Sequence, residues 1–190
     1  MPSILLTPPA AEPLTLAEAK IWLRVEHDDD DELIASLITG ARTLVEQETR
    51  RALITQVWRI VRDSWPASGR LEISPAPLRQ VLAVRIYDAA GAAQEIETDV
   101  FTLATGGAPG VLGLLPGALP QQPGRALAGI EIDVEVGYGA DGSAVPEPLR
   151  QAIRLLVAHG YENRGGEPAG NARLPAHVAL LIAPYRVLSL

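Results

Sequence analysis

The clearest structural signal in this chain of 190 residues is the stretch Ile130-Glu131-Ile132-Asp133-Val134-Glu135-Val136. Aliphatic and acidic residues alternate along it, which predicts a strand with one dry face and one wet face, because successive side chains of a strand point to opposite faces. Such a strand is typical of antiparallel sheets. Further strand patterns precede it at 57–63, 80–87, 94–97 and 101–104. No helical pattern separates these segments, so we expect an antiparallel sheet or a small barrel.

Helical patterns lie on both sides of this strand-rich region. The first is Leu14-Thr15-Leu16-Ala17-Glu18-Ala19-Lys20-Ile21-Trp22-Leu23-Arg24-Val25-Glu26. Thr15 and Glu18 have the spacing of a capping box, which predicts a helix that begins after Thr15 and ends near Val25. A second helix is predicted from the acidic run 28–31 to residue 50 or 51, because its apolar residues recur on one face.

Two more helical segments follow the strand-rich region. One begins near Pro146 to Pro148, where proline is tolerated in a first helical turn, and continues to Tyr161. The other lies within 174–183, and Pro184 ends or kinks it. The predicted fold class is therefore α+β: a small helical core of about four helices with a large antiparallel β insertion between helix two and helix three.

These patterns divide the chain into four parts. Residues 1–13 contain four prolines and no periodicity, so we expect an extended N-terminal arm. Residues 14–52 and 145–164 are expected to form the helical core, and residues 53–144 the β insertion. Residues 165–190 comprise a glycine-containing flexible link and an apolar C-terminal segment.

Composition excludes several classes of protein. The absence of cysteine removes disulfide scaffolds, thiolate metal sites and cysteine catalysis. A net charge of −7 argues against a protein that grips nucleic acid over its whole surface, because neutralising phosphates needs clustered cations. Residues 149–190 carry five arginines against two glutamates, which either orients the chain toward acidic partners or is ordinary surface variation. No run of about 18 apolar residues exists, so we expect no membrane span and no membrane partner.

A glycine turn supports an alternative function. Residues Gly137-Tyr138-Gly139-Ala140-Asp141-Gly142 match the spacing of a dinucleotide-binding turn. Such a turn should open directly into a helix whose N-terminus meets the pyrophosphate, whereas residues 143–146 intervene here. A plain turn is the simpler interpretation. The alternative is a small nucleotide-binding protein or enzyme that uses residues 137–142, and a third possibility is a monomeric β-domain that binds carbohydrate or peptide.

No other motif indicates catalysis or metal binding. Counted from Asp28, a calcium loop needs glycine and glutamate where the chain has Leu33 and Thr39. Carboxylates in this run instead suit the first turn of a helix. The three histidines have no partner at metal-ligand spacing. We therefore expect no metal, no cofactor and no enzymatic activity.

The C-terminal segment is strongly apolar, although chain ends are normally polar unless something holds them down. Its apolar residues are Val178, Leu180, Leu181, Ile182, Tyr185, Val187, Leu188 and Leu190. So much apolar surface packs either on the chain's own domain or on a partner. The residues alone leave both interpretations open.

Two regions of the chain carry a resemblance to a known family. The first combines the Leu-Thr-Leu-Ala-Glu-Ala-Lys stretch from residue 14, Leu-Arg-Val-Glu from residue 23 and the four aspartates at 28–31. The second combines 145–153, 161–164, 174–181 and 184–186. In order and spacing this set resembles the head–tail connector, or adaptor, family of tailed phages, prophages and gene transfer agents. Gly160 departs from the family pattern, so helix three is expected to bend or end there.

The resemblance implies a structural protein in the neck of a virion or phage-like particle, assembled in the bacterial cytoplasm. Twelve copies would form a ring under the portal, extend the DNA channel and join head to tail. The implied partners are other copies of the chain, the portal protein and a tail-side stopper or tail terminator protein. Double-stranded DNA would pass through the lumen without specific binding.

Two sets of candidate residues follow from the resemblance. The set expected to dock onto the portal is Arg173, Leu174, Val178, Leu181, Ile182, Tyr185, Arg186, Leu188 and Leu190. The set expected in the helical core or between subunits is Leu16, Trp22, Leu33, Leu37, Leu44, Leu149, Ile153, Leu156 and Tyr161.

Overall fold

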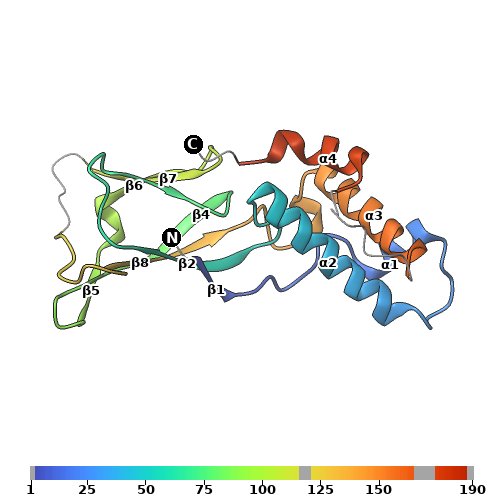
Figure 1. Ribbon diagram of the computed structural model, residues 1–190, viewed down its shortest axis with the longest axis horizontal. Coiled ribbons are helices and arrows are strands. Elements are labelled where there is room, and N and C mark those ends of the chain that lie inside the picture. Colours follow the sequence, from blue (N-terminus) through green and yellow to red (C-terminus); the bar gives the residue numbers. More distant parts are fainter. Residues whose placement is uncertain (1–2, 116–120, 165–173, 188–190) are drawn as a thin grey trace. The chain divides into compact units, whose positions relative to one another are not determined.

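The computed structural model describes residues 3–115, 121–164 and 174–187. The chain divides into two compact units, whose strands and helices are labelled in Figure 1. The β unit comprises residues 1–9 and 55–137, and the helical unit comprises residues 10–54 and 138–190. Each unit is therefore built from segments that are distant in the sequence.

The β unit contains a five-stranded antiparallel sheet with the order β1-β2-β8-β4-β5. Its strands are β1 (Ser3–Thr7), β2 (Gln56–Arg62), β4 (Leu78–Tyr87), β5 (Ala93–Ile96) and β8 (Ile130–Val136). A second antiparallel sheet has the order β3-β7-β6. Its strands are β3 (Arg70–Ile73), β6 (Phe101–Ala104) and β7 (Gly110–Leu114).

Strand β8 lies in the middle of the five-stranded sheet and has the two predicted faces. Its aliphatic residues at 130, 132, 134 and 136 are fully buried, which accounts for the dry face. On the other face Asp133 accepts two hydrogen bonds from Arg59 of β2, at 2.7 and 2.9 Å, and one from Arg85 of β4, at 2.7 Å. Burial opposes ionisation of this carboxyl group, but the hydrogen bonds from both arginines hold the pKa of Asp133 below its usual range.

The same face continues as a ladder of cross-strand polar pairs. Glu131 forms an ion pair with Arg59 at 3.1 Å and accepts a hydrogen bond from the Tyr87 hydroxyl at 2.8 Å. Glu135 pairs with Arg79 at 2.9 Å. Opposite charges on neighbouring strands stabilise a sheet, and Glu131 and Asp133 each have partners on both neighbouring strands.

The helical unit contains α1 (Leu16–Leu23), α2 (Asp31–Thr49), α3 (Glu147–Glu162) and α4 (Ala176–Ile182). The predicted capping box of α1 is confirmed: the Thr15 hydroxyl accepts a hydrogen bond from the Glu18 N–H, and the Thr15 N–H donates to the Glu18 carboxylate at 2.8 Å. Helix α2 packs on α3, while α1 contacts both of them and α4 packs mainly on α3.

The core of the helical unit receives apolar side chains from all four helices. The fully buried members include Ala19 of α1, Ile34 and Ile38 of α2, Ile153 of α3 and Val178 of α4. Helix α3 does not end at Gly160 but continues to Glu162. A Cβ atom at Gly160 would lie 2.7 Å from the Leu37 side chain, so this glycine allows α3 to approach α2 closely.

The predicted α+β class is confirmed: the described residues form four α-helices and two antiparallel sheets, whose strands apart from β1 lie between α2 and α3. Strands β1, β3 and β7 have no counterpart among the predicted elements. Strand β1 lies within the arm that we expected to be extended, and it pairs with β2. By length and hydropathy, none of the helices within the described ranges qualifies as a membrane span.

Candidate docking surfaces

The C-terminal segment packs on the helical unit through one side of α4. Val178 and Ile182 are completely buried in the core of that unit. Leu174, Leu181 and Tyr185 are partly buried against the same core. Leu180 points away from the core and is 75% exposed, and Arg186 is also exposed. The part of this segment that is open to a partner is therefore narrower than the predicted set.

The guanidinium group of Arg51 holds the chain that follows α4. Its Nε donates a hydrogen bond to the Tyr185 carbonyl at 2.6 Å, and a terminal nitrogen donates to the Tyr138 hydroxyl at 3.0 Å. The guanidinium carbon lies 6.0 Å from the centre of the Tyr138 ring and 5.8 Å from that of Tyr185, within the range of a cation–π interaction. Arg51 thus ties the end of α2 to two distant segments of the helical unit.

Two further contacts secure the same part of the chain. The Val187 N–H donates to the Thr49 carbonyl at 3.0 Å, and the Arg186 guanidinium pairs with the Glu48 carboxylate. Together with Arg51, these contacts hold residues 185–187 against the helical unit. Arg173, Leu188 and Leu190 of the predicted docking set lie outside the described residues.

The second predicted set separates into buried and exposed residues. Leu149 and Ile153 are fully buried, while Leu16, Leu33, Leu37, Leu156 and Tyr161 are partly buried. Trp22 and Leu44 are exposed. Beside Trp22, Ile21 is 79% exposed, although the sequence reasoning did not select it. The sequence of α1 gave no clear signal for it, because apolar residues occur on more than one side of this helix.

The acidic run before α2 connects three helices. Lys20 of α1 donates to Asp28 and Asp31, each at 2.6 Å. Asp30 accepts hydrogen bonds from Arg164, at 2.8 and 3.1 Å, and from the Tyr161 hydroxyl, at 2.6 Å. These hydrogen bonds stabilise the ionised carboxylate and so lower the pKa of Asp30, and the bond from Arg164 contributes most to this lowering. The carboxylates therefore hold α1 and the end of α3 to the start of α2.

The glycine turn at 137–142 is filled by the chain itself. A Cβ atom at Gly139 would lie 2.4 Å from the Ala144 side chain, and one at Gly142 would lie 2.3 Å from the Pro13 carbonyl oxygen. Helix α3 begins only at Glu147, after a short 3₁₀ turn at Gly142–Ala144. The glycines thus permit close backbone packing, and the turn does not present a helix N-terminus to a phosphate.

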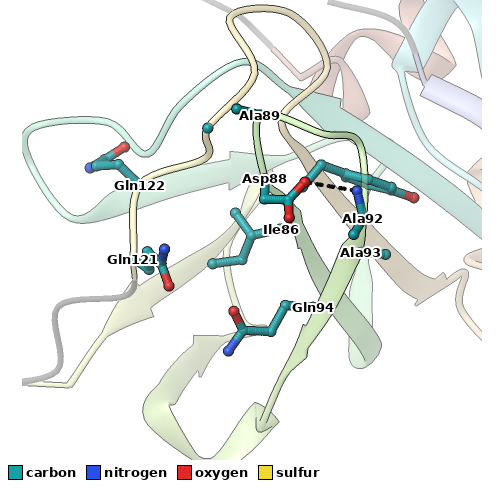
Figure 2. Close-up of a pocket in the computed structure, with 10 residues that line it drawn as sticks. Ile86, Asp88, Ala89, Ala92, Ala93, Gln94, Gln121 and Gln122 are labelled. Atoms are coloured by element: carbon teal, nitrogen blue, oxygen red, sulfur yellow. Dashed lines mark hydrogen bonds between the residues drawn. The ribbon is translucent and has the colours of Figure 1, made fainter.

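A pocket of the β unit lies beside the turn between β4 and β5, where Gln94, Gln121 and Gln122 line it (Figure 2). Asp88 also lines it, but one of its oxygens accepts hydrogen bonds from the N–H groups of Ala90 and Ala92, each at 2.8 Å. The Tyr87 hydroxyl donates to Glu131 instead. Among the described lining residues, the titratable groups therefore serve the fold, and none of them is an acid placed beside a base.

Comparisons with known proteins give a consistent result. The family model of the phage gp6-like head-tail connector protein matches residues 13–100. A solved structure described as "Neck of empty GTA particle computed with C6 symmetry" matches with 30% sequence identity and a TM-score of 0.84. The match covers 100% of this chain and 97% of that chain. The chain belongs to the phage gp6-like head–tail connector family.

Two further structures match this connector with the same identity and the same coverage of both chains. One is described as "Virion of native gene transfer agent (GTA) particle", with a TM-score of 0.84. The other is described as "Neck of native GTA particle computed with C12 symmetry", with a TM-score of 0.82. A comparison with curated protein sequences gave no match. The connector is a structural virion protein rather than an enzyme, and its solved relatives belong to necks with rotational symmetry.

Proposed function

We propose that this connector forms a ring in the neck of a phage-like particle of the gene transfer agent type. The observation that carries the proposal is the match to neck structures over the whole chain, at 30% identity and with 97% of the other chain covered. Because both the β unit and the helical unit fall within the match, the likeness extends beyond the segment recognised by the family model.

The proposed ring contains twelve copies. The support is the C12 symmetry used for the neck of the native particle in a relative. In such a ring every copy presents one surface to the copy before it and a different surface to the copy after it. The exposed apolar residues Ile21 and Trp22 of α1, and Leu44 of α2, are candidates for these contacts.

The end of the chain is proposed to dock onto the portal protein. Since Val178 and Ile182 are buried within the helical unit, the contact surface is assigned to Leu180, to Arg186 and to the residues that follow Val187. Arg186 already pairs with Glu48, so its docking to an acidic group of the portal would exchange one carboxylate for another. Arg51 would set the direction in which the docking residues leave the helical unit.

The opposite side of the ring is proposed to receive a stopper or tail terminator protein, and DNA would pass through the lumen. The net charge of −7 supports a channel that does not bind the DNA passing through it, because a chain of this charge repels phosphate groups on average.

A gene deletion tests this function. In the organism that encodes the connector, its loss should leave DNA-filled heads and free tails that do not join, and expression of the intact gene should restore joined particles. Electron microscopy of purified particles measures the fraction that is joined. Joined particles that persist at the original level without the protein would show that it is not the connector.

Two variants then test portal docking. Removal of residues 188–190 avoids every described core residue, so the protein should fold normally while joined particles become at least tenfold fewer. Leu180→Lys should weaken docking in the same direction. Leu127→Lys is a matched control, because Leu127 is equally exposed but belongs to the β unit. Normal joining by both docking variants would reject this assignment while leaving the ring untouched.

A further inference from the structure

The β unit has four strand edges without a neighbouring strand among the described residues. Strands β1 and β5 are the two ends of the five-stranded sheet, and β3 and β6 are the two ends of the three-stranded sheet. A strand edge presents unpaired N–H and C=O groups, to which another chain can add a strand. Soluble proteins therefore protect such edges, commonly with charged side chains.

Two of the four edges carry this protection. Strand β5 contains Glu95, and β3 contains Arg70 and Glu72. The Glu72 carbonyl also accepts a hydrogen bond from Arg62, which places a guanidinium group at that strand. Charges at these positions disfavour the approach of a further strand.

The other two edges, β1 and β6, carry no charge. Strand β1 is Ser-Ile-Leu-Leu-Thr, and its Ile4, Leu5 and Leu6 are 49%, 42% and 42% exposed. Because successive side chains point to opposite faces, apolar surface is exposed on both sides of this strand. Strand β6 is Phe-Thr-Leu-Ala, with Leu103 40% exposed and its two neighbours also exposed. Uncharged, apolar edges of this kind are more open to pairing with a further strand than charged edges are.

A ring of identical subunits requires two different surfaces on each copy that fit one another. The complement of a strand edge is another strand edge, since each supplies the donors and acceptors that the other lacks. Strands β1 and β6 are the ends of different sheets of the β unit, and Figure 1 shows them at separate places within that unit. We propose that β1 of one copy pairs with β6 of the next copy, so that backbone hydrogen bonds join neighbouring subunits around the ring.

This inference rests on the proposed ring, and it adds a contact to those of α1 and α2. A pair of such short strands is weak in isolation. In a ring whose subunits are all bound to the same portal, the strand pair would form between every two neighbouring subunits. Each of these pairs would then stabilise the ring, since bound neighbours meet at high effective concentration. The exposed Leu5 and Leu103 would then become buried together at each joint.

Engineered cysteines test the pairing directly, because the natural chain contains no cysteine. Leu5→Cys is combined in turn with Thr102→Cys, Leu103→Cys and Ala104→Cys, and particles that contain the protein are exposed to a mild oxidant. Residues opposite each other on paired strands have Cβ atoms about 5 Å apart, which is close to disulfide geometry. Three positions are needed because a shift by one residue moves a side chain to the other face.

We expect at least one pair to give a ladder of disulfide-linked multimers that extends toward the complete ring, while each single variant stays monomeric on a denaturing gel. Protein that is present in the neck but forms no ladder with any pair would overturn the β1–β6 contact and leave the proposed function standing. Dimers formed by Leu5→Cys alone would also overturn it, because they would show β1 pairing with β1. Absence of the protein from the particles would instead contradict the proposed function.

A second measurement uses charge. Leu5→Lys and Leu103→Lys introduce a charged side chain on β1 and on β6, as β3 and β5 naturally carry. Each should reduce incorporation into necks at least tenfold while the purified protein keeps its melting temperature, since both positions are exposed. Leu127→Lys, at an exposed residue outside the strands, should be incorporated normally. Equal incorporation of all three variants would reject the inference.

Discussion

The helical unit and the β unit are stabilised in different ways. In the helical unit, apolar side chains from four helices meet in one cluster, and the ion pairs of Arg150 with Glu18 and of Arg164 with Asp30 lie toward its surface. In the β unit, one face of β8 is dry, and the other holds Asp133 between two arginines. Loss of one side chain therefore leaves a cavity in the first unit but an unpaired charge in the second.

The two units also differ in what they expose. Both units expose separate apolar side chains, such as Leu180 and Leu127, but the β unit also exposes the edges of strands. Contacts made by the helical unit should therefore depend on side-chain shape. Contacts made by the β unit should depend on backbone register.

The largest effect is expected at Asp133. Asp133→Ala leaves Arg59 and Arg85 without their shared carboxylate, and removal of one partner from a buried ion pair typically costs about 3–5 kcal/mol. Replacing Asp133 and Arg85 together by leucine and methionine should cost much less, because Arg59 keeps its ion pair with Glu131 and neither removed charge leaves its partner behind. Denaturant unfolding of the variants measures both values, and an equal loss in the two would show that the charges are not the cause.

The effect at Asp133 should also depend on pH. Its pKa is lowered in the folded protein, so its stabilising contribution is present above the unfolded pKa of about 3.9 and is lost as the pH falls through the folded value. The difference in unfolding free energy between the natural protein and Asp133→Ala should shrink below about pH 4. A difference that stays constant down to pH 2 would contradict this linkage.

A smaller effect is expected for the core position Ile182 of α4. Ile182→Ala should lower the free energy of unfolding by about 2–4 kcal/mol, because it leaves a cavity in the helical unit. Leu180→Ala in the same helix should change it by less than about 0.5 kcal/mol, since Leu180 is exposed. Calorimetry of the two variants measures the contrast, and similar melting temperatures would mean that α4 is not part of the core.

Arg51 should have an effect of about 1–3 kcal/mol. Arg51→Met removes a charged donor from the Tyr185 carbonyl and from the Tyr138 hydroxyl. Because these bonds hold residues 183–187, limited proteolysis of that segment should become about tenfold faster, while the unfolding of the β unit stays unchanged. Arg51→Lys is the informative companion, since it keeps the charge but loses the forked geometry. Unaltered proteolysis in both variants would exclude a clamping role.

The smallest effect is expected at the start of α1. Thr15→Ala removes the hydroxyl that caps the helix and should cost about 1 kcal/mol. Thr15→Ser keeps the hydroxyl and serves as the control. Chemical denaturation of the two variants checks the difference, which should vanish if the capping box contributes nothing to folding.

Much of the fold was predictable because its signals are local. The capping box of Thr15 and Glu18, the single apolar stripe of α2 and the alternation of β8 each lie within a few turns or residues of chain. Strands β1 and β7 were not predicted because they lack such a local signal. Strand β1 is exposed on both faces and β7 contains two glycines, so neither shows a clear alternation.

The candidate surfaces were predictable only in part. An apolar C-terminal segment was visible in the residues, but whether each side chain faces the core or a partner was not. Val178 and Ile182 proved to be buried, and Leu180 between them proved to be exposed. Ile21 escaped notice because α1 is apolar on several sides, which hides the side that the unit leaves uncovered.

Periodicity and capping chemistry thus sufficed for the α+β class and for most helices and strands, because backbone conformation responds to neighbours within a few residues. The pairing of Asp133 with Arg59 and Arg85, the clamp of Arg51 on Tyr185 and the distribution of charge over the four strand edges emerged only in the folded chain. These features join residues that lie tens of positions apart, and which of them meet depends on how the sheets and helices pack.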